Sequence, residues 1–209
     1  MTDAVRPRLL LATRNPGKVR EYLRFLEDLP VNVVTLDEAG IEDDVDETGE
    51  TILQNAVLKA TAYAEKSGML TLADDSGLEV DALDGEPGVR SARYAGDGAS
   101  EDTRNRYLLQ KLENIPDDRL QARFRCVIAI ATPDLEIETS EGTCEGRMVR
   151  EPRGSTGFGY DPIFYVPEYD MHMAELTMDE KNSISHRGKA MAGARPIVER
   201  KVREARTKS

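Results

Sequence analysis

The sequence has very little cysteine and histidine, the residues that build disulfide frameworks and zinc sites. It contains two cysteines, Cys126 and Cys144, and two histidines among 209 residues. Neither cysteine belongs to a C-x-x-C pair or lies beside a histidine, so we interpret both as small, buried, apolar side chains in a reducing compartment. So few nitrogen and sulfur ligands nearly exclude a zinc site.

The sequence also lacks a long hydrophobic run and a surplus of positive charge. No apolar stretch approaches the roughly 20 residues of a membrane-spanning helix, and no apolar signal core follows Met1. We therefore expect a cytoplasmic protein. The net charge of −11 argues against non-specific binding to nucleic acid, which requires a basic surface. A small anionic ligand is compatible with this charge, because a few convergent cations and a metal ion can hold one locally.

The alternation of apolar segments along the chain predicts an α/β fold with a mixed β-sheet flanked by helices. With 39% hydrophobic and 32% charged residues, the composition is that of a soluble globular protein. No Pro- or Ser-rich linker divides the chain, so we expect residues 1–209 to form one domain. Strand patterns occupy residues 8–13, 31–36, 69–73, 78–83, 121–132, 135–149 and 163–166. Helical patterns occupy residues 19–26, 52–66, 100–113 and those from about 186 onward, where Pro196 is expected to kink or interrupt the helix.

The first candidate functional segment lies between a predicted strand and a predicted helix. A glycine allows close approach of the backbone, the helix N-terminus offers N–H groups, and Lys18 adds positive charge, which together favour a bound phosphate. The spacing differs from that of a Walker A loop. The alternative is an ordinary turn in which Asn15 caps the helix. The segment consists of Thr13, Arg14, Asn15, Pro16, Gly17 and Lys18.

The second segment places two adjacent carboxylates, Asp74 and Asp75, at the carboxyl end of an apolar strand. Two acids are costly to bury without a cation, and α/β sheets bind ligands at this end of their strands. Carboxylate oxygens suit Mg²⁺, which combines one or two of them with substrate phosphates. The alternative is a solvated turn that begins at an aspartate.

The third segment is the acidic loop, residues 37–50, in which Glu47 could add a carboxylate to a metal site. Most of the other acids in this loop are expected to be solvated. Asn55 and Lys59 follow on the next predicted helix and share one face, because they are four residues apart. The alternative is the polar face of a surface helix.

The fourth segment lies late in the chain and combines glycines, an aromatic ring and several cations. The ring of Phe158 could stack on a base, and Asp161 could accept hydrogen bonds from ring N–H groups. Lys181, His186 and Arg187 could hold a base oxygen or a phosphate. The alternative is a glycine-rich loop around a core phenylalanine, followed by a basic helix start.

Taken together, these segments resemble the inosine triphosphate pyrophosphatase family, also called XTP/dITP diphosphatases. The resemblance covers roughly residues 8–200, in order, with no departure at a motif position, and leaves residues 1–7 and about 201–209 outside it. The matching residues are Ala12, Thr13, Asn15, Lys18 and Glu21; Glu47, Thr48, Gly49, Asn55, Ala56, Lys59 and Ala60; Ala73 to Leu78; Pro87, Gly88, Val89 and Ser91 to Tyr94; Gly157 to Pro162; Ala174, Glu175 and Leu176; Lys181 and Asn182; and Ser185 to Gly188.

The resemblance implies an Mg²⁺-dependent enzyme that hydrolyses ITP, dITP and XTP to the monophosphate and pyrophosphate, usually as a homodimer. It also implies an elongated α/β structure of two lobes with the substrate in a central cleft. Residues 13–18 would hold the triphosphate, and Ser76 would contact the substrate. Glu47 and Asp75 would bind Mg²⁺, Asp75 would act as general base, and Lys59 would be catalytic. The nucleotide would be held by Phe158, Gly159, Tyr160, Asp161, Lys181, His186 and Arg187.

General chemistry agrees with this expectation and leaves two alternatives open. Polyphosphate cleavage needs charge neutralisation, an oriented water and cations for the departing pyrophosphate, and the chain offers all three residue types. One alternative is an enzyme with another leaving group or base, such as a nucleotide phosphatase or a pyrophosphatase for a modified pyrimidine. The other is a nucleotide sensor or protein-interaction module without catalysis. Whether Asp74 binds metal or only supports Asp75 also stays open.

Overall fold

The computed structural model describes residues 6–208 of the chain. Residues 1–5, where the sequence shows no signal core, and Ser209 lie outside the described residues. Along the part of the chain that is described, no helix combines the length and apolar character needed to cross a membrane.

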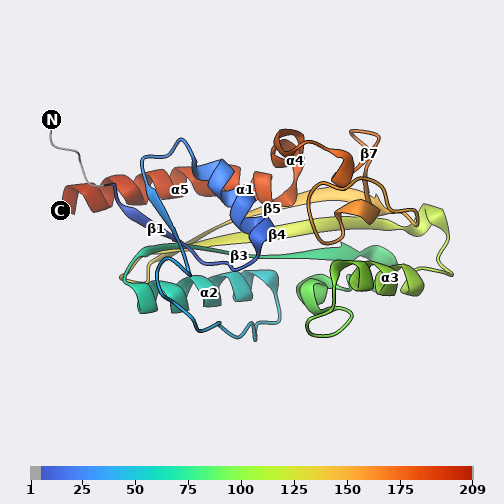
Figure 1. Ribbon diagram of the computed structural model, residues 1–209, viewed down its shortest axis with the longest axis horizontal. Coiled ribbons are helices and arrows are strands. Elements are labelled where there is room, and N and C mark those ends of the chain that lie inside the picture. The colour runs from blue at the N-terminus through green and yellow to red at the C-terminus, as the bar shows by residue number, and fades with distance from the viewer. Residues whose placement is uncertain (1–5, 209) are drawn as a thin grey trace. The chain divides into compact units, whose positions relative to one another are not determined.

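A seven-stranded β-sheet organises the chain (Figure 1), with its strands in the order β2-β1-β3-β4-β5-β6-β7. β1 pairs in parallel with β2 and β3, whereas β6 pairs antiparallel with β5 and β7, so the sheet is mixed as predicted. The strands are β1 (Arg8–Leu11), β2 (Asn32–Thr35), β3 (Leu70–Val80), β4 (Gln121–Ala131), β5 (Ile137–Met148), β6 (Phe164–Val166) and β7 (Met171–His172). The α-helices are α1 (Pro16–Leu26), α2 (Ile52–Ser67), α3 (Glu101–Lys111), α4 (Met178–Ile184) and α5 (His186–Lys208).

The chain divides into two compact units. Unit 1 contains the chain up to Asp75, Val127–Glu141 and the chain from Ala190 onward, and unit 2 contains Ser76–Cys126 and Gly142–Lys189. The expectation of one domain, with a cleft between two lobes, stays a prediction.

In unit 1, helices cover both faces of the strands. α2 lies on one face, and α1 and the later part of α5 lie on the other (Figure 1). α1 begins at Pro16 because Asn15 caps it: the Asn15 Oδ1 accepts hydrogen bonds from the backbone N–H groups of Gly17 and Lys18 at 2.9 and 3.0 Å.

Local signals also define both ends of α2. The side chain of Thr51 accepts from the Gln54 N–H, and the Gln54 side chain accepts from the Thr51 N–H, which forms a capping box. The helix ends at Gly68, whose φ of 63° is a left-handed conformation that glycine adopts without strain. These caps fix the start and the rotation of the helix that carries Asn55 and Lys59.

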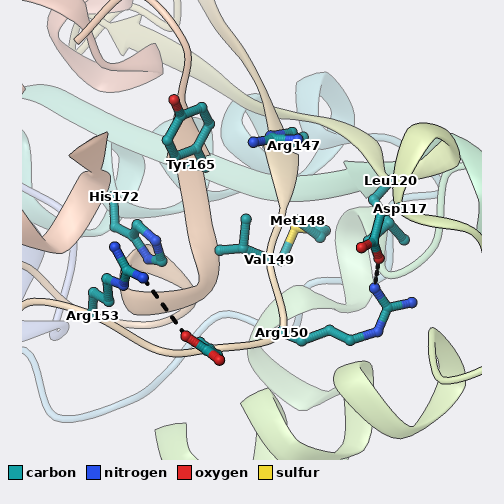
Figure 2. A pocket seen from close by; sticks show the side chains of 10 residues that line it. Asp117, Leu120, Arg147, Met148, Val149, Arg150, Arg153, Tyr165 and His172 are labelled. Atoms are coloured by element: carbon teal, nitrogen blue, oxygen red, sulfur yellow. Dashed lines mark hydrogen bonds and ion pairs between the residues drawn. The ribbon is translucent and has the colours of Figure 1, made fainter. Parts of the chain in front are cut away.

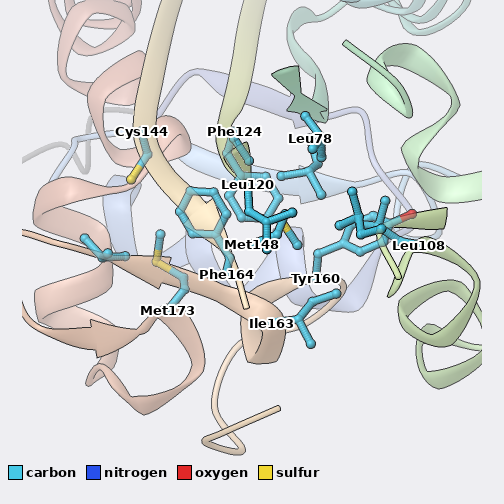
Figure 3. Packing of buried hydrophobic residues seen from close by; sticks show 14 of the residues in the cluster. Leu78, Leu108, Leu120, Phe124, Cys144, Met148, Tyr160, Ile163, Phe164 and Met173 are labelled. Atoms are coloured by element: carbon cyan, nitrogen blue, oxygen red, sulfur yellow. The ribbon is translucent and has the colours of Figure 1, made fainter. Parts of the chain in front are cut away.

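Unit 2 has its own hydrophobic core (Figure 3). The rings of Phe124 and Phe164 lie 4.5 Å apart, between centroids, near the middle of this cluster. Both cysteines are buried as predicted, Cys144 at the edge of this core and Cys126 in β4. α3 and α4 lie on opposite sides of the strands of unit 2 (Figure 1). The cluster consists of Leu78, Val80, Leu108, Leu112, Leu120, Ala122, Phe124, Cys144, Met148, Tyr160, Ile163, Phe164, Val166, Met173, Leu176 and Ile184.

The largest departure from the sequence-based expectation is in β3. The sequence predicts two strands, residues 69–73 and 78–83, with residues 74–77 between them, but a single strand runs from Leu70 to Val80. The prediction was wrong because acidic and small residues favour turns locally, whereas partners on α1 and α2 allow two aspartates to remain inside a buried strand. Gly77 is needed in this strand, since a Cβ there would lie 2.3 Å from the carbonyl oxygen of Gly88.

The end of the chain differs in smaller ways. α5 is continuous through Pro196, so the proline does not interrupt the helix. The short elements α4 and β7 were not predicted. α4 begins at a capping box formed by Thr177 and Glu180, which is the local signal that identifies it.

Replacing Phe164 by alanine should destabilise the protein by about 3–5 kcal/mol, because the ring is fully buried and its removal leaves a cavity. Urea unfolding followed by circular dichroism measures this change. Leu23→Ala is the control, since Leu23 is 44% exposed on α1 and its replacement should cost less than about 0.5 kcal/mol. Equal costs for the two variants would contradict the placement of Phe164 in the core.

Candidate active site

Two adjacent aspartates of β3 form the centre of the candidate site in unit 1. Asp74 is 1% exposed and Asp75 is 6% exposed. Successive side chains of a strand point to opposite faces, and the partners of these two follow that rule. The Lys18 ammonium on α1 lies 2.8 Å from Asp74 Oδ2, whereas the Asn55 side chain on α2 donates to Asp75 Oδ2 at 3.3 Å.

Lys59 lies on the Asp75 side of the strand. Its Nζ is 2.5 Å from Glu47 Oε1 and 4.0 Å from Asp75 Oδ1, so one cation serves two carboxylates. Burial raises the pKa of the Asp75 carboxyl above its ordinary value, and the charges of Lys59 and Lys18 oppose that rise. Burial alone would lower the pKa of Lys59, but the carboxylates of Asp74, Asp75 and Glu47 raise it, which keeps the ammonium charged.

Asn55 connects the acidic loop to Asp75. Its Oδ1 accepts from the Gly49 N–H at 2.8 Å, and its Nδ2 donates to Asp75. This double contact explains why an asparagine stands one helical turn before Lys59. An aspartate at position 55 would offer no donor to Asp75 and would add a further negative charge.

The predicted phosphate segment forms a capped turn between β1 and α1. Because Asn15 occupies the N–H groups of Gly17 and Lys18, these amides are not available to a phosphate in this conformation. The Thr13 Oγ1 accepts from the Asn15 N–H at 3.2 Å. The Lys18 side chain lies beside Asp74, and the guanidinium of Arg14 contacts residues of the acidic loop. The alternative in which Asn15 caps the helix is therefore confirmed, and the binding of a phosphate by this segment stays a prediction that depends on the Lys18 side chain.

A second group of predicted residues comes together within unit 2. The Arg187 side chain is 1% exposed and its NH2 donates to Ser76 Oγ at 3.1 Å. Asp161 Oδ2 accepts from Lys181 Nζ at 2.6 Å and from the Phe158 N–H at 2.9 Å. The Lys181 and Arg187 cations lie 4.8 and 5.4 Å from the centroid of the Phe158 ring.

The tight loop around Phe158 depends on glycine. Gly157 has a φ of 77°, and a Cβ there would lie 2.1 Å from Asp161 Oδ2, so a larger residue would displace the carboxylate. The Gly159 carbonyl accepts from the Asn105 side chain on α3 at 3.1 Å. These contacts hold the backbone of the loop between a helix and an ion pair.

Two other predicted substrate contacts are engaged with the protein in this conformation. The Tyr160 hydroxyl donates to the Ser91 carbonyl at 2.9 Å, and burial raises the pKa of Tyr160 to about 12. The His186 ring stacks on Phe124, with centroids 4.8 Å apart. Their proposed contacts with a nucleotide stay predictions.

Sequence reasoning missed two residues that contact the loop around Phe158. The Ser91 carbonyl accepts from the Tyr160 hydroxyl, and the Asn105 side chain donates to the Gly159 carbonyl. Ser91 lies in a motif that the resemblance included, but its role was not assigned; its Oγ accepts from the Leu78 N–H at 2.8 Å and donates to the Gly88 carbonyl. Asn105 carried no signal, because its partner Gly159 is 54 residues away in the chain.

The carboxylates of unit 1 fit a metal that takes few protein ligands. Within residues 6–208, no group of three or more Asp, Glu, His or Cys side chains is arranged to hold an ion. Mg²⁺ does not require one, because it commonly uses one or two carboxylates together with water and substrate phosphates. Glu47 and Asp75 share one cationic partner, the Lys59 ammonium, so these two carboxylates would offer a small cation two hard oxygen donors.

Unit 2 also contains a pocket of about 450 Å³ that is separate from the predicted residues (Figure 2). Two of its arginines pair with acids of the same pocket, Arg150 with Asp117 and Arg153 with Glu151. No residue predicted from the sequence to bind substrate or metal lines it. The lining residues are Asp117, Leu120, Arg147, Met148, Val149, Arg150, Glu151, Arg153, Tyr165 and His172.

Comparisons with known proteins agree in both sequence and structure. The chain is 54% identical to a dITP/XTP pyrophosphatase of Desulforamulus reducens over 92% of this chain and 96% of that protein. It is 46% identical to a dITP/XTP pyrophosphatase of Bacillus subtilis over 91% and 96% of the two chains. A HAM1 protein structure from Coxiella burnetii matches with a TM-score of 0.84 and 41% identity, covering 92% of this chain and 98% of that one. The model of the Ham1 family matches residues 9–197, and the chain therefore belongs to the Ham1 family.

Proposed function

We propose that the chain is a Mg²⁺-dependent pyrophosphatase that hydrolyses ITP, dITP and XTP to the nucleoside monophosphate and pyrophosphate. The names of the relatives support the reaction. The main structural support for this reaction is the pair of buried aspartates in β3. Lys18 lies beside Asp74, and Asn55 and Lys59 lie beside Asp75. In a cell, this activity would remove damaged purines from the nucleotide pool.

The residues of unit 1 would act on the triphosphate. The Asp75 carboxylate would accept the proton of the attacking water, and its raised pKa suits a general base. As the water oxygen bonds to phosphorus, the α,β-phosphoanhydride bond breaks and its electron pair leaves with the pyrophosphate. Lys18 and Lys59 would stabilise the negative charge that develops there. Mg²⁺ held by Glu47 and Asp75 would supply further charge neutralisation.

The residues of unit 2 would hold the nucleoside. Phe158 offers an aromatic face, and the donors of Lys181 and Arg187 lie close to that ring. A base stacked on Phe158 would therefore present its edge oxygens to these cations. Asp161 would keep Lys181 in place, and Ser76 would orient Arg187.

Assembly and location are further parts of the proposal. We expect a homodimer in the cytoplasm that binds neither nucleic acid nor membranes, consistent with the net charge of −11. Light scattering of the purified protein tests the dimer. The competing reactions, removal of a single phosphate or cleavage of a modified pyrimidine nucleotide, differ in their products or substrates, and the following experiment separates them.

The enzyme should hydrolyse ITP and XTP faster than GTP, and GTP faster than ATP or pyrimidine triphosphates. Donors such as Arg187 and His186 can bond an oxygen at C6 but would oppose the amino group of adenine, and such sites reject the wrong base by up to about 10⁴–10⁵-fold. The measurement is kcat/KM for each nucleotide with Mg²⁺, assaying pyrophosphate and free phosphate separately. Equal values for ITP and ATP, or free phosphate as the first product, would refute the proposal.

Arg187→Ala should lower both the rate with ITP and the ratio of ITP to ATP hydrolysis. The reason is that the variant loses a donor that lies beside Phe158. Arg119→Ala is the matched control, since Arg119 is exposed on the surface of unit 2. An unchanged ITP-to-ATP ratio in Arg187→Ala would assign base selection to other residues.

Asp75→Asn should nearly abolish turnover, because an amide cannot accept the proton of water and binds Mg²⁺ poorly. Loss of a positioned base costs about 10²–10⁴-fold in rate, and circular dichroism should show that the fold is retained. Asp97→Asn is the control, because it removes the same charge from an exposed position. If folded Asp75→Asn kept more than about a tenth of wild-type kcat, Asp75 would not be the base.

Activity should require added Mg²⁺ and disappear in excess EDTA, while the melting temperature changes by only a degree or two. The reason is that Glu47 and Asp75 alone would bind the ion weakly, and substrate phosphates would supply the further oxygen ligands. Activity assays and thermal melts of the same samples measure both quantities. Full activity in the chelator would exclude a metal-assisted reaction.

A further inference from the structure

Arg14 contacts the acidic loop through all three nitrogens of its guanidinium group. Its Nε donates to Asp44 Oδ1 at 2.8 Å, its NH1 donates to Asp37 Oδ1 at 2.6 Å, and its NH2 donates to the Ile41 carbonyl at 2.6 Å. All three partners lie within eight residues of each other in unit 1. The three contacts fix both the position and the plane of the guanidinium.

The acidic loop has no helix or strand of its own between β2 and α2. Backbone hydrogen bonds form a turn at its start, where the Ile41 N–H donates to the Leu36 carbonyl, and side-chain contacts connect the loop to Arg14, just before α1, and to α2. Asp43 and Gly49 contact α2: Lys66 pairs with Asp43, and the Gly49 N–H donates to Asn55. Asp37, Ile41 and Asp44 contact Arg14. Glu47, which contacts Lys59, lies in the stretch that these two sets of contacts enclose.

Electrostatics make Arg14 a poor phosphate ligand in this arrangement. Two carboxylates, Asp37 and Asp44, lie within hydrogen-bond distance of its single positive charge. The group of three side chains therefore carries a net charge of about −1, which repels a triphosphate. These contacts use three of the five N–H donors of the guanidinium, so a phosphate would have to bond the remaining two beside both carboxylates.

We infer that Arg14 is a positioning residue that sets the acidic loop, and with it Glu47, at the candidate metal site. This inference rests on the proposed function and revises the expectation that Arg14 binds the triphosphate directly. Since Arg14 immediately precedes the Asn15 cap of α1, the same contacts connect the segment that carries Lys18 to the loop that carries Glu47. Metal affinity and the path of the acidic loop should then depend on the same contacts.

The test compares Arg14→Ala, Asp44→Asn and the double variant with wild type. The first readout is hydrogen–deuterium exchange of the amides of residues 37–50 in protein without metal or nucleotide. Each single variant should accelerate exchange in this loop, and the double variant should exchange no faster than Arg14→Ala, because Arg14→Ala already removes the contact that Asp44→Asn weakens. Exchange in Arg14→Ala equal to wild type would overturn the inference, whatever the enzyme hydrolyses.

The second readout is the Mg²⁺ concentration that gives half-maximal activity. It should rise by about fivefold or more in both single variants, as expected for coupled sites, while kcat at saturating Mg²⁺ stays within about twofold. If Arg14 instead bound phosphate directly, the two single variants would change inhibition by inorganic triphosphate in opposite directions. Arg14→Ala would weaken this inhibition, whereas Asp44→Asn would strengthen it by removing a repelling charge. That pattern would also overturn the inference.

Glu42→Gln is the matched control, because Glu42 is an exposed acid of the same loop and is not among the partners of Arg14. It should leave both readouts at wild-type values.

The proposed function and the role of Arg14 can be refuted independently of each other. A wild-type protein without pyrophosphatase activity would refute the function, whereas unchanged loop exchange in the variants would refute the role of Arg14 alone.

Discussion

The burial of two adjacent carboxylates in the middle of a strand is the constraint on which the rest of unit 1 depends. An unpaired buried charge costs several kcal/mol, so Asp74 and Asp75 can remain in β3 only with partners on both faces of the strand. Lys18 on α1 supplies one partner, and Asn55 and Lys59 on α2 supply the others. The capping residues of both helices therefore serve the site, because they fix where these partners stand.

Unit 2 meets a similar requirement with a different arrangement. Lys181 and Asp161 form an ion pair in which both side chains are less than 5% exposed, and Asp161 also accepts from the backbone of the Phe158 loop. The loop around the aromatic ring is thus held by the charge pair, and Gly157 leaves room for the carboxylate. Removal of one partner would leave the other charge buried, so the pair and the loop depend on each other.

The charged side chains around the β3 aspartates in unit 1 and the Lys181–Asp161 pair in unit 2 are held by buried contacts. Fixed charges of this kind suit the chemistry proposed for the chain. Phosphoanhydride cleavage gains most from fixed charges and a positioned base, since these need no reorganisation as the reaction proceeds. Several of the acids of residues 37–50 are paired with cations of the protein, including Arg14, Lys59 and Lys66, which reduces the negative charge of this loop without cancelling it.

Sequence patterns alone predict the α/β class, the bounds of most helices and strands to within a few residues, and the buried aspartates and lysines as candidate site residues. These follow from local patterns: apolar periodicity, capping residues and the order of the motifs. The remaining features depend on contacts between residues that are far apart in the chain. β3 continues through Asp74 and Asp75 because distant helices neutralise their charges, and Arg14 turns to Asp37 and Asp44 although its position suggested a phosphate. Arg187 meets Ser76 across 111 residues of chain. Such pairings depend on how the chain folds back on itself, and no local propensity encodes them.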